Sequence, residues 1–249
     1  MCDTCVRGKV KNGSQCEACL AGTFQNSTFC LSCPAGFTSE EDESTKCERC
    51  ESGMYNTDGG VCKSCYAGQY RSSSLKNATK CLPCLVGRYQ DQVGQASCLS
   101  CIPGLYNDEY GKNKCKNCAS GTSSDTQQRN ISCVVCATGS ASVAGSVACL
   151  SCLPGQYGDV AGQLCKECIA GKMSTSGSSS CTECGRGQYT NLPTKATKCD
   201  ACGPGKYGDQ VLQNSIDSCT NCPAGRYSSA KGVAGIDECN KCAAGKKNP

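Results

Sequence analysis

Fifteen copies of the pattern Cys-x-x-Cys-x-x-Gly span this chain and constrain its fold more than any other feature. The first copy runs from Cys2 to Gly8 and the last from Cys239 to Gly245, and a copy begins every 14 to 20 residues. All 30 cysteines belong to these pairs. A fixed period of this kind is typical of repeat proteins. We therefore divide residues 1–249 into tandem units that begin at residues 2, 16, 30, 47, 62, 81, 98, 115, 133, 149, 165, 181, 199, 219 and 239.

The composition indicates units held together by cysteines and not by an apolar core. Val, Leu, Ile and Phe together make up about 13% of the residues, and there is no Trp. A chain this poor in apolar residues cannot bury a conventional core. Small extracellular domains with the same shortage are stabilised by disulfides.

Each unit has the signals of a β-hairpin. Glycine recurs in the motif, which predicts a positive φ angle or a close backbone approach. The second residue after it is aromatic in nine copies, which we interpret as a miniature core; an exposed binding stripe is the alternative. A second glycine often stands near the tip, four residues before the next motif or, for Gly162, three: Gly94, Gly111, Gly145, Gly162, Gly177 and Gly235. We expect a mainly β, disulfide-rich fold, a linear array of 14 to 15 short hairpins forming an elongated rod with almost no helix.

Four Asn-x-Ser/Thr sequons lie near the hairpin tips. Asn12, Asn26 and Asn77 stand four residues before the next cysteine, and Asn130 stands three before it. Asparagine tolerates left-handed backbone geometry, as glycine does. We therefore predict N-linked glycans at these exposed positions and no other cofactor.

Three kinds of chemistry can use a Cys-x-x-Cys pair. Thioredoxin-like redox activity is disfavoured because the two intervening residues vary freely and no βαβ context surrounds them. Four thiolates from two motifs could hold zinc, but the sequons and the Ser/Thr/Gly-rich sequence point to export, where thiols oxidise. We expect disulfides and no metal site.

The sequence leaves the disulfide connectivity open. One scheme joins the second cysteine of each motif to the first of the next, and a crossed scheme, first to third and second to fourth, is the main alternative. The neighbour scheme places Cys2 and Cys242 in disulfides with parts of a longer chain and forms these pairs: Cys5 with Cys16, Cys19 with Cys30, Cys33 with Cys47, Cys50 with Cys62, Cys65 with Cys81, Cys84 with Cys98, Cys101 with Cys115, Cys118 with Cys133, Cys136 with Cys149, Cys152 with Cys165, Cys168 with Cys181, Cys184 with Cys199, Cys202 with Cys219, and Cys222 with Cys239.

The repeat resembles a known extracellular module. The segments Cys222-Pro-Ala-Gly-Arg-Tyr227 and Cys152-Leu-Pro-Gly-Gln-Tyr157 resemble the ephrin-receptor-like cysteine-rich repeat. The repeats are also similar to cysteine-rich surface proteins of protists. The resemblance implies a secreted or cell-surface location and a disulfide-rich β fold, but it implies no ligand. The abrupt ends lead us to expect a window on a longer chain.

Several classes of function are disfavoured. The net charge is +4 without clustered Lys and Arg, so we expect no nucleic-acid partner. No apolar stretch is long enough to span a membrane. There is no histidine, and no set of side chains forms a nucleophile with a base, so we expect no enzymatic activity. The acidic run Glu40–Glu43 lacks the ligand spacing of a calcium site, and we interpret it as a solvated loop.

Two functions remain. The first is an extracellular structural protein, a disulfide-linked and glycosylated rod that forms or coats a filament or cell-surface appendage, with itself or other extracellular proteins as partners. The alternative is the ectodomain of a receptor, adhesin or surface antigen that binds a protein or glycan ligand. The irregular stretch 118–148 is the candidate binding region in that case.

Overall fold

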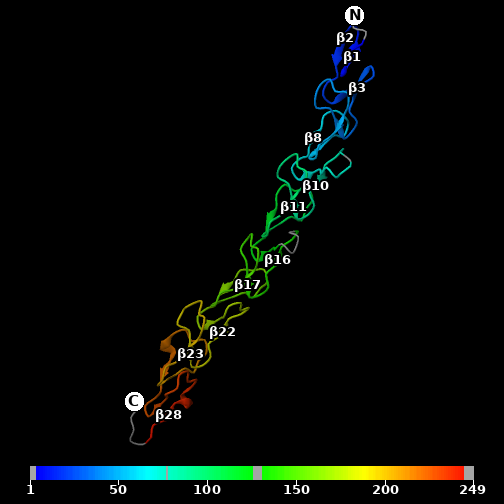
Figure 1. Cartoon of the computed structure of the whole chain (residues 1–249). Coiled ribbons are helices and arrows are strands. Elements are labelled where there is room, and N and C mark those ends of the chain that lie inside the picture. The colour runs from blue at the N-terminus through cyan, green and yellow to red at the C-terminus, as the bar shows by residue number, and fades with distance from the viewer. Residues whose placement is uncertain (1–3, 77, 126–130, 244–249) are drawn as a thin grey trace. The chain divides into compact units, whose positions relative to one another are not determined.

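The computed structural model describes residues 4–76, 78–125 and 131–243 as two compact units. The first unit comprises Met1–Asn117 and Asp125–Ser132, and the second comprises Cys118–Ser124 and Cys133–Pro249. Within each unit, β-hairpins follow one another in the order of the sequence (Figure 1).

Fourteen antiparallel two-stranded hairpins make up the described residues, and we number them 1 to 14 in chain order. The strand pairs are β1 (Lys9–Asn12) with β2 (Gln15–Ala18), β3 (Thr23–Asn26) with β4 (Phe29–Ser32), β5 (Phe37–Thr38) with β6 (Glu48–Arg49), β7 (Met54–Tyr55) with β8 (Lys63–Ser64), β9 (Gln69–Tyr70) with β10 (Leu82–Pro83), β11 (Arg88–Tyr89) with β12 (Leu99–Ser100), β13 (Leu105–Tyr106) with β14 (Lys116–Asn117), β15 (Thr122–Ser123) with β16 (Val134–Val135), β17 (Ser140–Ala141) with β18 (Leu150–Ser151), β19 (Gln156–Tyr157) with β20 (Lys166–Glu167), β21 (Lys172–Met173) with β22 (Thr182–Glu183), β23 (Gln188–Tyr189) with β24 (Asp200–Ala201), β25 (Lys206–Tyr207) with β26 (Thr220–Asn221), and β27 (Arg226–Tyr227) with β28 (Asn240–Lys241).

The outgoing strand starts directly after the motif glycine and carries the aromatic position. In hairpins 3 to 14 the return strand consists of the two residues between the cysteines of the next motif, as when Tyr89 pairs with Leu99. In hairpins 1 and 2 the return strands β2 and β4 are longer and begin one residue before the first of those cysteines. This register brings the second cysteine of one motif next to the first of the following one, so that a disulfide closes the base of each hairpin.

Helix is restricted, within the described residues, to two short 3-10 turns in the last two hairpins. They are η2 (Ile216–Ser218) and η3 (Ile236–Glu238). Gly235 caps η3 with an extended backbone (φ −172°), so the prediction that it forms a hairpin tip is wrong. Gly232 has the left-handed geometry instead (φ +74°), because η3 lengthens the return arm of this hairpin.

The buried hydrophobic residues are mainly cysteines. The second cysteine of a motif is almost fully enclosed, with relative exposures of 0% for Cys65, Cys84 and Cys118. Polar side chains fill most of the remaining interior, and large aliphatic side chains are mostly exposed. The predicted disulfide-rich, mainly β fold of repeated hairpins is confirmed.

Candidate functional site: the joint between hairpins

Consecutive hairpins meet at a recurring set of contacts, which we call the joint. Three positions form it: the motif glycine, the residue three positions after a motif glycine, which we call the joint residue, and the hairpin tip. The same hydrogen bonds recur from hairpin to hairpin, so the joint is the structural unit that the repeat encodes.

The motif glycine holds the next hairpin through its backbone N–H group. Gly36 donates to the carbonyl of Asn56 at 2.8 Å, and Gly53 donates to that of Arg71 at 2.7 Å. In each case the acceptor is the joint residue of the following hairpin. The same bond is made by Gly22, Gly68, Gly87, Gly121, Gly139, Gly155, Gly187 and Gly205.

A side chain at the motif glycine would collide with a hairpin two places further along. The φ angle of Gly53 is +80°, and a methyl group added there would lie 1.9 Å from the carbonyl oxygen of Gly94. At Gly155 the corresponding distance to the oxygen of Lys195 is 2.2 Å. The glycine therefore adopts a left-handed backbone and also permits the close approach of another hairpin. Within each unit, the hairpins joined in this way contact the next two.

The tip that makes this approach is anchored by its own N–H group. Gly94 donates to the carbonyl of Cys65 at 2.8 Å, and Gly111 donates to that of Cys84 at 2.8 Å. Lys195 occupies the same position with φ +60°. Its use of left-handed geometry shows that the tertiary contact overrides the residue's own preference.

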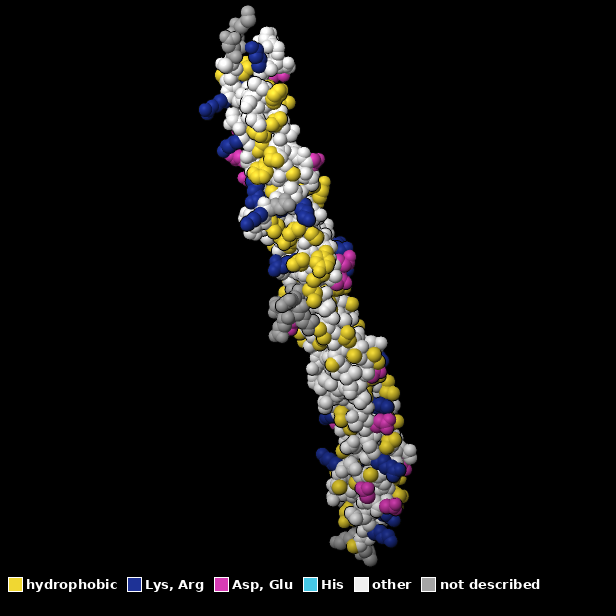
Figure 2. Space-filling view, turned by 90° about the vertical axis from the view of Figure 1, so that its right-hand side faces the viewer, with side chains coloured by type: hydrophobic (Ala, Val, Ile, Leu, Met, Phe, Trp, Pro, Cys, Tyr) yellow, Lys and Arg dark blue, Asp and Glu magenta, His cyan; other side chains and the backbone are white. Residues whose placement is uncertain are grey.

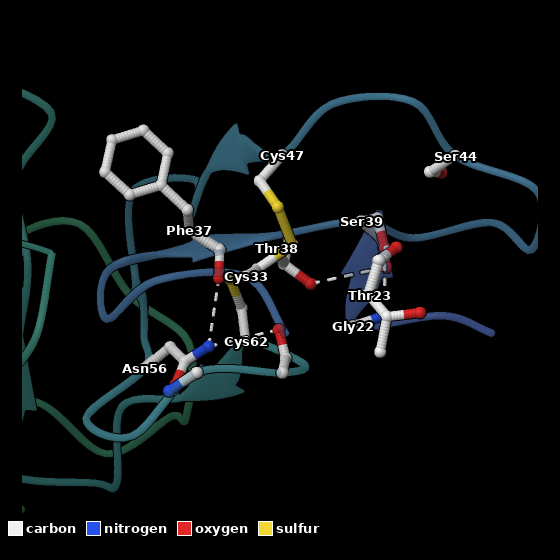
Figure 3. Close-up of a disulfide and its surroundings, with 12 residues drawn as sticks. Gly22, Thr23, Cys33, Phe37, Thr38, Ser39, Ser44, Cys47, Asn56 and Cys62 are labelled. Carbon is white, nitrogen blue, oxygen red and sulfur yellow. Dashed lines mark hydrogen bonds between the residues drawn. A yellow bond between two sulfur atoms is a disulfide. The ribbon is translucent and has the colours of Figure 1, made fainter. Parts of the chain in front are cut away.

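The side chain of the joint residue bonds back to the preceding hairpin. Figure 3 shows two of these bonds near the Cys33–Cys47 disulfide. Ser39 donates from Oγ to the carbonyl of Thr23 at 2.7 Å. Asn56 donates from Nδ2 to the carbonyl of Phe37 at 3.0 Å. Gln25, Arg71, Asn107, Ser142 and Ser174 donate to carbonyls at the equivalent position.

Most of these polar joint residues are buried, and Gln25 is partly buried. Sequence reasoning missed them. Asn107 and Thr190 are 0% exposed, and Ser124 is 1% exposed. Buried polar groups are stable only when they are hydrogen-bonded, and the joint supplies the partners. The sequence did contain a signal at the position three residues after the motif glycine. From Lys11 to Ser228, no residue at this position is aliphatic or aromatic.

Arg71 is the one charged joint residue that is buried among the described residues, with 1% relative exposure. Its guanidinium donates to the carbonyls of Met54, Cys50 and Glu51. Burial lowers the pKa of Arg71, and the nearby charge of Arg49 lowers it further. These carbonyls accept the hydrogen bonds of a cation that forms no ion pair with a carboxylate among the described residues.

The fourteen disulfides of the structure follow the neighbour scheme, and none of them is crossed. They join Cys5 to Cys16 and continue through to Cys222 with Cys239, with Cα–Cα separations of 5.3 to 6.0 Å. Cys242 is a free thiol, and Cys2 lies outside the described residues. The paired sulfurs have no thiolate to offer zinc.

The aromatic position contributes less to the core than we expected. Only Tyr189 is buried, and it packs with Cys202 and Cys219. The other rings are half-buried, and Tyr227 is 37% exposed. The second cysteine and the joint residue therefore occupy the interior, with the ring covering them from outside.

The two described sequons lie at exposed hairpin turns. Asn12 and Asn26 end strands β1 and β3, and the residue after each, Gly13 or Ser27, takes the positive φ angle. The expectation of left-handed geometry at Asn12 and Asn26 is thus wrong, because the following residue adopts it instead. Asn77 and Asn130 lie outside the described residues.

Surface carboxylates are mostly engaged by neighbouring groups of the chain. In the run 40–43, Asp42 accepts a hydrogen bond from the N–H of Ala21 at 2.8 Å, and Glu43 pairs with Lys9 at 3.0 Å. In hairpin 7, hydrogen bonds from Lys112 and then Lys116 lower the pKa of Glu109 to about 2. Within the described residues, no group of three or more Cys, Asp or Glu side chains could hold a metal ion.

One comparison with known proteins identifies a segment of the chain. Residues 72–111 match the family model described as tyrosine-protein kinase ephrin type A/B receptor-like. No curated protein matches the chain. The resemblance seen in the sequence is therefore confirmed for a segment that runs from hairpin 5 to hairpin 7.

The class of protein follows from this match and from the disulfides. The chain is a cysteine-rich repeat protein, and fourteen disulfides with an ephrin-receptor-like match suggest an extracellular location. No helix in the described residues is long and apolar enough to cross a membrane.

Proposed function

We propose that the chain is an extracellular structural protein, without enzymatic activity, that associates with itself to form or coat a filament or cell-surface appendage. The observation that carries the proposal is the reach of the joint. Within each unit, hairpins bond to the next one through the motif glycine and contact the tip of the one after it, as with Gly53, Arg71 and Gly94. Stability in such an array comes from contacts between neighbours.

The chemistry of the joint suits a structural role outside the cell. Disulfides close every described hairpin, and the joints use backbone groups and short polar side chains. Such contacts leave the outward residues free to differ between repeats without loss of the fold. A structural protein can use that freedom to build lateral contacts.

N-linked glycans are part of the proposal. Asn12 and Asn26 occupy equivalent exposed turns in hairpins 1 and 2, where a bulky sugar meets solvent. We expect each to be glycosylated when the chain is secreted by a eukaryotic host. An enzyme that removes N-glycans should lower the mass of the secreted chain, and Asn12→Gln or Asn26→Gln should each remove one glycan. An unchanged mass in both variants would contradict this part of the proposal.

Electron microscopy of the purified chain, with analytical ultracentrifugation over a range of concentrations, tests the proposal. Assemblies that grow with concentration are the expected result. The mass of the unreduced chain should be about 28 hydrogens below the free-thiol mass, for fourteen disulfides. A chain that stays single at all concentrations and captures a soluble extracellular protein would instead support a receptor or adhesin.

A further inference from the structure

An apolar hollow of about 790 Å³ lies on the surface of the first unit. Leu85 and Val86 of one motif line it together with Ile102 and Pro103 of the next, and Tyr110 and Ile131 complete its apolar wall. Several of these side chains are exposed, with relative exposures of 54% at Leu85 and 64% at Ile102 and Tyr110. Hydrophobic side chains are visible at the surface in Figure 2. A concave site of this size and character is typical of binding sites.

The hollow has one charged residue, and that residue is a cation. Arg88 lines the hollow and forms no ion pair with any residue that the structure describes. Its Nη1 atom lies 3.4 Å from the carbonyl of Cys98, which is a weak contact. The carboxylate of Glu109, which precedes Tyr110 in the chain, is already bonded to Lys112 and Lys116. An occupant that brings an apolar group beside a free carboxylate would therefore complement the site.

The second unit carries such a group on η3. Ile236 is exposed at 42%, and Asp237 and Glu238 follow it on the same short turn. Glu238 accepts a hydrogen bond from the N–H of Ala234 at 3.3 Å. Asp237 forms no hydrogen bond or ion pair with another described residue, so its carboxylate is free for a partner.

The related turn η2 is a poorer match. Ile216 is also exposed, at 52%. However, the carboxylate of Asp217 lies 3.1 Å from the hydroxyl of Ser215, and η2 has one acidic residue where η3 has two. This difference provides a matched comparison within one chain.

We propose that the hollow around Arg88 receives the η3 turn of a second copy of this chain, with Ile236 against Leu85 and Ile102 and with Asp237 beside Arg88. This inference rests on the proposed self-association. The two surfaces differ, so the contact is heterologous. Repetition of a heterologous contact that does not close into a ring produces an open filament.

The test uses the full 249-residue chain with its disulfides intact, followed by ultracentrifugation over a range of concentrations. Arg88→Glu and Asp237→Arg should each raise the concentration at half-assembly about tenfold or more, because each variant places like charges at the centre of the contact. The double variant, Arg88→Glu with Asp237→Arg, should restore assembly. Asp217→Arg on η2 carries the same charge change and should leave assembly as it is in the unaltered chain.

The outcomes separate the inference from the proposed function. If the unaltered chain assembles and Arg88→Glu has no effect, or if Asp217→Arg weakens assembly and Asp237→Arg does not, the occupant is wrong and self-association stands. Cross-links between labelled and unlabelled chains that place another segment against the hollow would also overturn the inference. A chain that never assembles would refute the proposed function, and the inference with it.

Discussion

Replacing the motif glycine Gly53 by alanine separates the two roles of this position. The left-handed backbone of Gly53 costs a residue with a side chain roughly 1–2 kcal/mol. The added methyl group would also lie 1.9 Å from the carbonyl oxygen of Gly94, far inside van der Waals contact. The backbone fixes the position of the methyl group, and the oxygen it meets is itself a backbone atom. Neither can rotate aside, so the tip of hairpin 6 must move away.

The magnitude follows from the bonds that this movement breaks. The tip loses the hydrogen bond from Gly94 to the carbonyl of Cys65 and the one from Arg71 to the carbonyl of Gln95. Each contributes about 1 kcal/mol, so Gly53→Ala should destabilise the region by about 3–4 kcal/mol in total. The control is Gly205→Ala, since Gly205 has φ +75° and open space where the side chain would be. It should cost only the roughly 1–2 kcal/mol of the backbone.

Amide hydrogen exchange read by mass spectrometry, with the disulfides intact, distinguishes the two variants. In Gly53→Ala, exchange at the tip around Gly94 should accelerate roughly 30-fold, which corresponds to the loss of about 2 kcal/mol of tip contacts. In Gly205→Ala, faster exchange should be confined to the substituted repeat. Equal local effects in both variants, or an unchanged tip in Gly53→Ala, would refute the argument that hairpins two places apart are in contact.

Two further predictions concern hairpin 7. Asn107→Ala should destabilise the joint by about 1–3 kcal/mol, because its Nδ2 atom no longer donates to the carbonyl of Arg88; amide exchange should quicken there, and an effect no larger than that of the exposed Asn113→Ala would contradict the prediction. The pKa of Glu109 is about 2 in the folded chain, so its carboxylate should stay ionised until the pH approaches 2. Because this folded pKa lies below the unfolded one, the ionised carboxylate stabilises the fold fully above the unfolded pKa, and this stabilisation is lost as the pH falls towards 2. In a carboxyl NMR titration Lys112→Met should raise that pKa, and an unmoved midpoint would show that Lys112 is not its main cause.

The parts of the fold that follow from local sequence could be predicted. The spacing of the cysteines defines the repeat. Gly36 and the equivalent motif glycines predict a left-handed backbone, which the structure has. The hairpins could be predicted because the segment between two consecutive cysteine pairs is too short to form much else. The sequence alone did not decide between the neighbour and crossed disulfides, because both satisfy the same spacing.

The joint could not be predicted from one repeat, because its partners belong to other repeats. Ser39 and Asn56 are residue types that are usually found at the surface. Their burial is favourable only because their side chains donate hydrogen bonds to carbonyls of the preceding hairpin. The tip in hairpin 14 was misplaced for a related reason. Gly232 and Gly235 are equally plausible in sequence, and the inserted η3 turn decides between them.

The disulfides and the joints make different contributions to the array. A disulfide such as Cys84–Cys98 restricts the unfolded chain, but it acts within one hairpin and does not orient the next. Orientation comes from the bonds of Gly87 and Asn107 to the neighbouring hairpin. These bonds use backbone groups and, in most repeats, one inward side chain, so the outward residues can vary while the contacts between hairpins are kept. A surface feature such as the hollow around Arg88, the binding site that we propose, can therefore occur in one part of the array without any change in the joint beneath it.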